Sequence, residues 1–517
     1  MPKVILFVLL LSSCASAHEY FAIKVVDDQT GRGVPLVELR TVNDIKYYTD
    51  SNGIAAVLEP GLMNQNVFFN VKSHGYEFPA DGFGSRGKAF ELKPGGSATL
   101  KIKRLNIAER LYRITGQGIY RDSVLVGEKF PIKEPVLNGK VLGQDSVQMT
   151  EYHGKLFWTF GDTNKPSYPL GHFGTSGATS LKPEVGRASV PAGGLDPNVG
   201  IDLMYFVGPD GFSRPMCPLP GPGPKWLDSL VVLKDDAGTD RLLSRFVRVK
   251  NLGETLQRGW VIFNDKTETF ELLADWALDQ PWWPCCHAWV APASAPAGTP
   301  PSKVDYVYFA YPYPHVRVAA KIDALKNQAE YQAFTCLAPG TAYKKGAAKL
   351  DRSADGKLNW NWKTNTGYVS DDQQKELLNA GLIKPDECWY GFKNAETGKP
   401  ILAHGGSVAF NAYRKRWIMV FHSKMDSPSN LGEVYYAESE TLEGPWHTAR
   451  KIVTHDKYSF YNVEHHPLFD QDGGRVIYFE GTYTTMFSGN PEPTPRYEYN
   501  QMMYRLDLGD ARLQLAK

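Results

Sequence analysis

The chain has 517 residues, of which 42% are hydrophobic and 22% charged, so it can bury a large core and is not a disordered protein. Lys and Arg number 57 against 56 Asp and Glu. This balance argues against nucleic acid as a partner, because no basic excess exists to hold a phosphate backbone. No apolar run reaches about 18 residues, so we expect no transmembrane helix.

Residues 1–17 read MPKVILFVLLLSSCASA, with one lysine before an apolar stretch and small residues after it. This is the pattern of a secretory signal peptide, so we expect an exported protein that is extracellular, periplasmic or on the cell surface. Two cleavage sites fit the pattern. Cleavage after Ala17 leaves His18 as the first residue. The LSSC segment instead resembles a bacterial lipobox, which would make Cys14 a lipidated first residue and the one membrane attachment that we expect.

Residues 18–104 form the first predicted domain. FAIKVVD alternates apolar and polar residues as a half-buried strand does, and further short strands follow between turn clusters, which predicts a β-sandwich. The segments VVDDQTGRGVPLVEL, TDSNGIA and KSHGYEF resemble the carboxypeptidase regulatory-like (transthyretin-like) domains. That resemblance implies a structural or binding appendage without chemistry of its own. Residues 105–140 are interpreted as a connection with room for a short helix.

Residues 141–517 read as a series of short strands in which aromatic residues recur. Hairpin units recur, as in EYHGKLFWTF, NAYRKRWIMVF and DQDGGRVIYFEG, and this repetition favours a β-propeller over a jelly roll or a β-helix. About 370 residues at roughly 65–80 per blade predict about five blades. An insertion at about 320–400 contains a predicted helix at DDQQKELLNAGL. The predicted fold class is therefore all-β, a small sandwich followed by a propeller.

Two parts of the propeller region resemble known families. SVAFNAYRKRWIMVFHS, followed by VYYAESETLEGPWHTARKI with its GPW corner, resembles a blade of glycoside hydrolase family 43. The QDS segment and FWTFGDT resemble the first blade of the group called domain of unknown function 4185, which includes endo-D-arabinanases. The resemblance implies a five-bladed glycosidase. The chain lacks a clear match to the full acid triad of family 43, so the catalytic residues stay open.

Four acids are candidate catalytic residues, because glycoside hydrolysis needs two carboxyl groups across the scissile bond. Asp145 and Asp162 stand on neighbouring strands of one hairpin, where one would act as base or nucleophile and the other would tune it or bind sugar. The alternative for Asp162 is a turn cap. Glu464 precedes two histidines and is a candidate general acid, and Glu480 is a third acid on the same hairpin. We expect all four to line one mouth of the propeller channel.

Four further residues are candidate substrate ligands: His404, beside a Gly pair; His465, beside Glu464; and Arg496 and Tyr499 in PTPRYEYNQ. Surface ion pairing is the alternative for Arg496. Aromatic residues crowd the loops and would stack on sugar rings, although core packing accounts for at least half of them. They are Trp282, Trp283, Trp289, Tyr311, Tyr313, Trp360, Trp362, Trp389 and Tyr390.

Cys285 and Cys286 stand next to His287, a combination also found at metal sites, but no C-x-x-C spacing accompanies it. We therefore expect buried thiols in an aromatic loop. No cofactor is expected, although the propeller channel leaves room for a structural cation. We expect a monomer that has a carbohydrate as its only substrate or partner.

These observations predict an exported protein of carbohydrate metabolism, in first place a glycoside hydrolase that cleaves a polysaccharide or oligosaccharide with a carboxylate pair. Two alternatives stay open. One is a polysaccharide lyase on a uronic acid polymer, with His465 or Tyr499 as base and Arg496 neutralising charge. The other is a non-catalytic glycan-binding surface protein. A serine hydrolase is not expected, because the chain has no G-x-S-x-G elbow.

Overall fold

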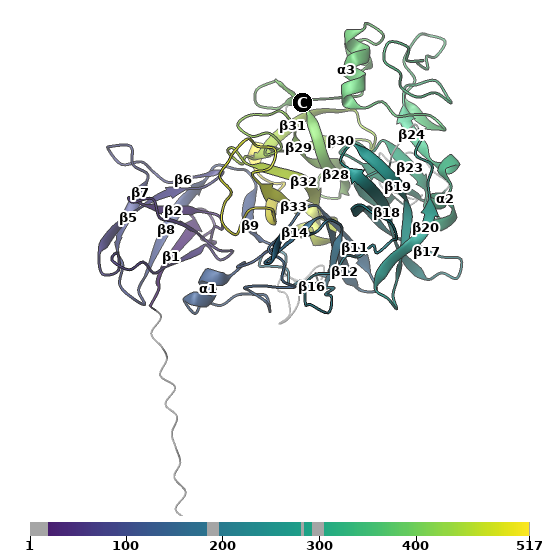
Figure 1. Ribbon diagram of the computed structural model, residues 1–517. Coiled ribbons are helices and arrows are strands. Elements are labelled where there is room, and N and C mark those ends of the chain that lie inside the picture. The colour runs from purple at the N-terminus through teal and green to yellow at the C-terminus, as the bar shows by residue number, and fades with distance from the viewer. Residues whose placement is uncertain (1–18, 184–195, 281–283, 292–303, 516–517) are drawn as a thin grey trace, which may run out of the picture.

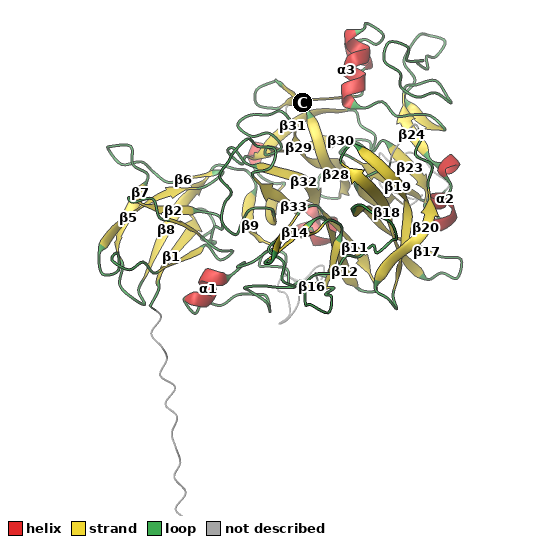
Figure 2. Ribbon diagram, viewed as in Figure 1, coloured by secondary structure: helices red, strands yellow, loops and turns green. Residues whose placement is uncertain are grey.

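The computed structural model describes residues 19–183, 196–280, 284–291 and 304–515. Figure 1 shows the strands β1–β8 gathered at one end and the remaining strands in a larger body beside them. Strands and loops make up most of both parts, as Figure 2 shows. The predicted leader at residues 1–17, with Cys14, lies outside the described residues, as does His18, so export and its cleavage site stay predictions.

The N-terminal part is a sandwich of two four-stranded sheets. The first sheet has the order β4-β1-β8-β6, with β1 Phe21–Asp27, β4 Ile54–Val57, β6 Tyr76–Glu77 and β8 Ser97–Arg104. The second has the order β3-β2-β5-β7, with β2 Glu38–Thr41, β3 Lys46–Tyr48, β5 Asn66–Lys72 and β7 Gly87–Glu91. Because alternate side chains point to one face of a strand, Ile23, Val25, Leu39, Phe69 and Leu100 meet between the sheets and are almost wholly buried.

Five larger sheets follow. The first contains β11 Val147–Tyr152, β12 Lys155–Phe160, β15 Ser176–Ser180 and β16 Met204–Tyr205. The second contains β17 Lys225–Lys234, β18 Asp240–Asn251, β19 Glu254–Asn264 and β20 Thr269–Asp275. The third contains β21 His287–Ala291, β22 Tyr306–Ala310, β23 Val316–Ala319, β24 Gln332–Thr335 and β25 Asn361–Thr364.

The fourth sheet contains β26 Tyr390–Asn394, β27 Pro400–Ile401, β28 Ala403–Asn411, β29 Arg416–Ser423, β30 Val434–Ser439 and β31 Trp446–Val453. The fifth contains β32 Ser459–His465, β33 Val476–Thr484, β34 Asn500–Asp507 and β9 Glu109–Arg113. One edge strand of each sheet contacts an edge strand of the next, in the cyclic order β11, β17, β21, β28, β32 and back to β11. We call these five the first strands of their blades. This ring confirms the predicted propeller behind a small sandwich.

The ring is closed by a strand from the far end of the sequence. β9 pairs antiparallel with β34, with Arg110 opposite Tyr504, and so becomes the outermost strand of the fifth sheet. The segment 105–140, which the sequence analysis interprets as a connection, therefore supplies a strand to the propeller as well as the short helix α1 Arg121–Leu125.

The remaining elements lie between or outside the blades. A small sheet contains β10 Gly143–Gln144, β13 Thr163–Lys165 and β14 Tyr168–His172. The insertion holds α2 Ile322–Lys326 and α3 Asp371–Asn379, which confirms the predicted helix. Ser370 and Gln373 form a capping box at the start of α3. The 3-10 helices are Gln328–Glu330, Pro385–Glu387, Pro467–Phe469, Asp472–Gly474 and Ala511–Leu513.

Within the described ranges, no helix combines the length and the apolar character that crossing a membrane requires. The cysteines there, Cys217, Cys285, Cys286, Cys336 and Cys388, are all free thiols.

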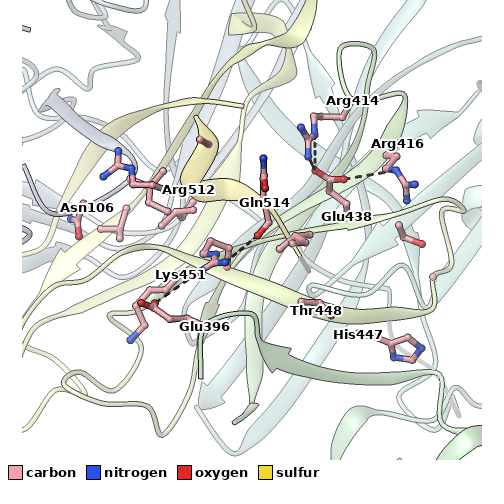
Figure 3. Close-up of a pocket in the computed structure, with 18 of the residues that line it drawn as sticks. Asn106, Glu396, Arg414, Arg416, Glu438, His447, Thr448, Lys451, Arg512 and Gln514 are labelled. Atoms are coloured by element: carbon pink, nitrogen blue, oxygen red, sulfur yellow. Dashed lines mark hydrogen bonds and ion pairs between the residues drawn. The ribbon is translucent and has the colours of Figure 1, made fainter. Parts of the chain in front are cut away.

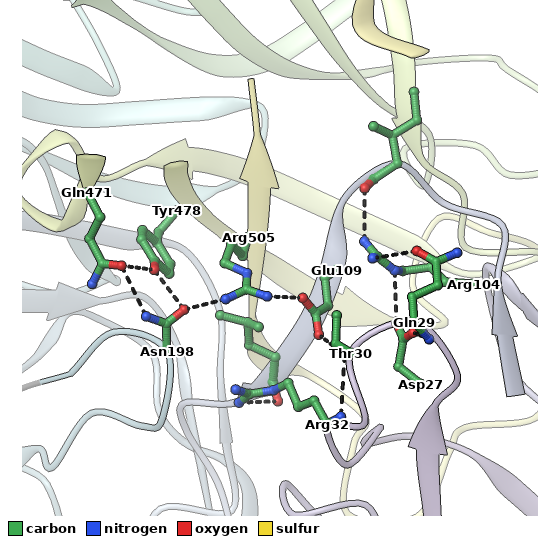
Figure 4. A network of polar contacts seen from close by, with 12 residues as sticks. Asp27, Gln29, Thr30, Arg32, Arg104, Glu109, Asn198, Gln471, Tyr478 and Arg505 are labelled. Carbon is green, nitrogen blue, oxygen red and sulfur yellow. Dashed lines mark hydrogen bonds and ion pairs between the residues drawn. The ribbon is translucent and has the colours of Figure 1, made fainter. Parts of the chain in front are cut away.

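Polar contacts join the sandwich to the propeller along β9. Figure 4 shows Glu109 at the centre of one network, where it accepts hydrogen bonds from Thr30 of the sandwich (3.1 Å) and from Arg505 of β34. The next residue, Arg110, is fully buried. Its guanidinium donates to the Pro35 carbonyl (3.1 Å), the His74 carbonyl (3.1 Å) and Ser73 Oγ (2.5 Å). The propeller strand thus holds three points of the sandwich with one side chain.

We predict that Arg110→Ala destabilises the protein by about 3–5 kcal/mol, because it leaves two buried carbonyl groups and one hydroxyl without their charged donor. Scanning calorimetry should show the sandwich unfolding at a lower temperature than the propeller. Arg416→Ala is the matched control. The Arg416 side chain is 42% exposed and pairs with the exposed Glu440 at 3.2 Å, so its loss should change stability by less than about 1 kcal/mol. Equal melting temperatures of Arg110→Ala and Arg416→Ala would contradict the role of Arg110 in holding the sandwich to the propeller.

Candidate active site

A cavity of about 690 Å³ lies at one end of the ring of first strands. Four of these strands, β11, β17, β28 and β32, and the start of β21 all contribute lining residues, so the cavity lies on the propeller axis. The acids that line it are Asp145, Asp162, Asp228 and Glu464. Ligand sites form where inner strands converge, and the convergence of acids here makes this cavity the candidate active site.

Irregularities in the backbone direct side chains into this cavity. The first strands β17, β28 and β32 each shift register where they reach it, between Asp228 and Val231, Ala403 and Gly406, and Tyr461 and Glu464. Within two of these irregularities a non-glycine residue has positive φ, Ser229 at 56° and Asn462 at 52°. β-bulges re-aim side chains next to functional sites, and residues held in the left-handed region need support from their surroundings.

Asp145 stands between β10 and β11 and is held by two tyrosines. Tyr461 donates its hydroxyl to Asp145 Oδ2 at 2.8 Å, and Tyr499 donates a second hydrogen bond. A Cβ on Gly161 would stand 2.2 Å from Asp145 Oδ1, so only glycine leaves room for this carboxylate. Burial and the negative charge of Asp162 raise the pKa of Asp145 to about 6, while the tyrosine hydrogen bonds act in the opposite direction.

Asp162 follows β12 and is held by two N–H groups. Its Oδ1 accepts from the Trp226 indole at 2.7 Å and from the Gly174 backbone at 2.9 Å. Burial raises the pKa of Asp162, and both hydrogen bonds oppose that rise. Gly174 is 12 residues away in the sequence and Trp226 is 64 away, so neither contact is the local turn cap that is the alternative for Asp162. The indole contact joins Asp162 to the neighbouring blade.

Glu464 enters the cavity from β32. Its Oε2 accepts a hydrogen bond from Gln148 of β11 at 3.0 Å, and its Oε1 lies 3.6 Å from His287 Nδ1 of β21. Glu464 and His287 also line a second cavity of about 440 Å³, which is formed by residues farther along the same strands. The pair therefore stands where the two cavities adjoin along the propeller axis.

The expectation that all four predicted acids line one mouth is wrong for Glu480. This residue is fully buried, does not line the cavity, and shares a 2.6 Å hydrogen bond with His466 Nε2. It stands on β33, the second strand of its blade, opposite Glu464 of the first strand. Second-strand side chains pack between blades, and burial together with the charge of Glu464 raises the pKa of Glu480 well above its usual range.

The predicted substrate ligands divide by position. Tyr499 lines the cavity, and His404 stands behind the lining residue Tyr311, whose hydroxyl lies 3.1 Å from His404 Nδ1. His465 lines the second cavity and contacts Asp470 at 2.8 Å. Arg496 lies away from the cavity, 3.9 Å from Asp122, so the surface ion pair that was its alternative describes it better. Their roles in binding stay predictions.

Several lining residues were not among the predicted site residues. Asp228 of β17 accepts two hydrogen bonds from Arg245 of β18, at 2.8 and 2.5 Å. A charged residue inside the apolar run WLDSLVV was the available signal. Tyr461 and Asn462, which precede Glu464 on β32, also line the cavity. Nothing in the local pattern marks Trp226 as the donor to Asp162, because 64 residues separate them.

Most of the predicted sugar-stacking aromatics pack in the core instead. Tyr311 lines the candidate site and Trp289 the second cavity. Trp282 and Trp283 lie outside the described residues. The others belong to hydrophobic clusters or pack against them: Tyr313, Trp360, Trp362, Trp389 and Tyr390.

A larger groove, of about 1590 Å³, runs beside β31 and the C-terminal residues. Figure 3 shows Arg414 and Arg416 on either side of Glu438. Arg414 contacts Glu438 at 2.6 Å, and Arg416 contacts Glu440 at 3.2 Å. Mutual pairing already satisfies these charges, and the groove lies outside the ring of first strands, so we place the site in the smaller axial cavity.

In the part of the chain that the structure describes, no three His, Cys, Asp or Glu side chains gather in an arrangement that could hold a metal ion. The structural cation that the sequence leaves room for stays a prediction.

No protein-family model matches the chain, and no curated protein matches it by sequence. Solved structures with a similar arrangement include a GH43_1 enzyme from Xanthomonas citri complexed with xylose, which is 10% identical over 74% of this chain and 91% of that chain with a TM-score of 0.31. An endo-arabinase from Bacteroides thetaiotaomicron is 10% identical over 74% of this chain and 99% of that chain, with a TM-score of 0.31. An exo-beta-1,3-galactanase from Clostridium thermocellum is 10% identical over 73% and 60%, with a TM-score of 0.34. Similarity at this level assigns neither a reaction nor a substrate to this chain.

The raised pKa of Asp145 predicts a pH-dependent stability. The folded pKa of about 6 exceeds the ordinary value of 3.8, so the folded protein holds this proton more tightly, and stability falls as the pH rises from about 4 through 6. Relative to Asp145→Asn, the wild type should lose about 2 kcal/mol between pH 4 and pH 7.

Thermal melting of both proteins across this range measures the difference. Burial also raises the pKa of Asp50 to about 6 and that of Glu433 to about 7, but both groups are present in the two proteins and cancel. A difference in melting temperature that does not change with pH would contradict the raised pKa.

Proposed function

We propose that the protein is a glycoside hydrolase that acts on a glycan through Asp145 and Asp162. The observation that carries this proposal is the contrast between two carboxyl groups in one cavity. Burial raises the pKa of both groups and each accepts hydrogen bonds that oppose the rise, but the charge of Asp162 adds to the rise at Asp145, whose pKa reaches about 6. A pair of carboxyl groups that ionise at different pH is what glycoside hydrolysis requires.

In this proposal Asp145 is the general acid and Asp162 the base or nucleophile. The charge of Asp162 and burial raise the pKa of Asp145 to about 6, so Asp145 keeps its proton in mildly acidic solution. Asp145 then gives the proton to the leaving oxygen, and Tyr461 and Tyr499 stabilise the carboxylate that remains. The sequence alone favours different roles, with Asp145 as base or nucleophile and Glu464 as the general acid.

Glu464 serves in this account as a sugar ligand. Gln148 holds one of its carboxylate oxygens, and the carboxyl group faces the cavity between the blades of β11 and β32. A carboxylate oriented in this way accepts hydrogen bonds from sugar hydroxyls. Such contacts position the substrate against the reacting groups.

The charges of the cavity disfavour the lyase alternative. Among the described residues, the lining contains three aspartates and one glutamate but no lysine or arginine. A uronic acid polymer carries a carboxylate on each sugar, and β-elimination needs a cation or strong donor to neutralise it. Arg496, the expected neutraliser, lies outside the cavity. A neutral sugar therefore fits this lining better than a uronate.

We predict that Asp145→Asn and Asp162→Asn each lower turnover about a hundredfold or more and leave folding intact, because Asn keeps the shape of the side chain but neither donates nor accepts the proton. Release of reducing sugar from a panel of neutral polysaccharides and oligosaccharides measures turnover. Asp236→Asn, an exposed turn residue, is the matched control and should keep full activity.

Three results would separate the competing functions. An unsaturated product that absorbs in the ultraviolet indicates a lyase. Binding to a glycan without any product indicates the non-catalytic alternative. Near-normal turnover in both Asp145→Asn and Asp162→Asn, on a substrate that the parent cleaves, would contradict the assigned pair.

A further inference from the structure

The mouth of the axial cavity carries exposed apolar side chains from three separate loops. Leu252 is 93% exposed, Phe487 56%, Phe173 53% and Met486 46%, and all four line the cavity. We call these four residues the apolar rim. Single exposed apolar residues are ordinary on protein surfaces, but a group that converges on one opening marks a binding surface.

The loops of the rim are anchored to the site. Phe173 precedes Gly174, whose N–H donates to Asp162. Leu252 occupies the turn between β18 and β19, and the Phe487 carbonyl accepts a hydrogen bond from Asn430 at 2.9 Å. Because these anchors fix the backbone, the apolar side chains are held at the opening although water surrounds them.

An apolar wall continues from the rim to the carboxylates. Pro224, Leu227, Val247 and Val249 line the cavity on the side of β17 and β18. Trp226 ends this wall, since its indole lines the cavity and donates its N–H to Asp162. The cavity thus has a carboxylate end at Asp145 and Asp162 and an apolar end at Leu252 and Phe173.

We propose that the substrate is a sugar joined to a hydrocarbon aglycone, such as an alkyl, aryl or lipid glycoside, with the sugar at the carboxylates and the aglycone along the apolar wall and rim. This inference rests on the proposed glycoside hydrolysis and names its substrate class. The rim is continuous with the catalytic cavity, and no cation in the described lining offers a partner to an anionic chain. A hydrocarbon is the occupant that gains most from leaving water at such a surface.

The reaction balances without a cofactor. The bond between the anomeric carbon and the aglycone oxygen breaks, and that oxygen takes the proton of Asp145 and leaves as an alcohol. Water supplies the hydroxyl group that the anomeric carbon gains, and its remaining proton restores the carboxyl pair. The alcohol leaves toward the rim, and the free sugar leaves from the carboxylate end.

The test measures binding in the full-length Asp145→Asn protein, which should not turn the probes over. The probes are hexyl, heptyl, octyl and nonyl β-glucosides and the matching β-galactosides, each below its micelle concentration and followed by titration calorimetry. We expect affinity to rise about three- to fourfold for each methylene in both series, because each one leaves water against the wall. Affinity that does not change with chain length would overturn the proposal.

Substitutions in the apolar rim test where the hydrocarbon chain binds. The rim variant carries Leu252→Ser, Phe173→Ser and Phe487→Ser together in the Asp145→Asn background. It should lower the gain in affinity to less than about twofold for each methylene. Phe83→Ser is the matched control, because Phe83 is 99% exposed on the sandwich and should leave the gain unchanged. An unchanged gain in the rim variant would place the hydrocarbon elsewhere and overturn the proposal.

Two further outcomes keep this inference distinct from the proposed function. If affinity does not change with alkyl chain length, but the protein hydrolyses a polysaccharide and Asp145→Asn abolishes that activity, then only the aglycone site is overturned. If affinity rises with alkyl chain length and the rim variant removes that rise, the aglycone site is supported even where no hydrolysis is found. In that case only the proposed reaction fails. A dimer in analytical ultracentrifugation that the rim variant dissolves, with a flat series, would show that a second copy of the chain covers the rim.

Discussion

The pairing of β9 with β34 is the constraint on which the candidate site depends. A propeller is a ring of sheets, and its first and last sheets must be held together although they come from distant parts of the chain. Here the outermost strand of the last sheet is β9, whose residues precede the first propeller sheet in the sequence. The same strand carries Arg110, which holds the sandwich, so one short segment closes the ring and fixes the N-terminal domain.

The groups that we propose as catalytic lie on the seam that this closure forms. Asp145 precedes the first blade, whereas its partners Tyr461 and Tyr499 belong to the last. Ser146 N–H donates to Thr482 at 3.0 Å, and Gln148 donates to Glu464, which tightens the same seam. The half-buried carboxyl group of Asp145 therefore gains its two tyrosine partners only when the ring is closed. This closure also supports the residues near the seam that have positive φ.

The sequence predicts local structure better than it predicts this seam. Strand alternation in FAIKVVD and the repeated hairpins lead to the sandwich and the propeller, and the capping residues around Ser370 mark a helix. No local pattern places β9 beside β34, or Tyr461 beside Asp145 across 316 residues. Glu464 and Glu480 look alike in sequence, and only the position of their strands in the blade puts one in the cavity and the other in the core.

The central claim is that water cleaves a glycosidic bond at this seam. Incubation with a cleaved glycan in heavy-oxygen water, followed by mass spectrometry of the products, tests it most directly. The account predicts that the new reducing end carries one oxygen atom from the solvent and that the other product carries none. An unlabelled, unsaturated product, or binding without any product, would contradict the account.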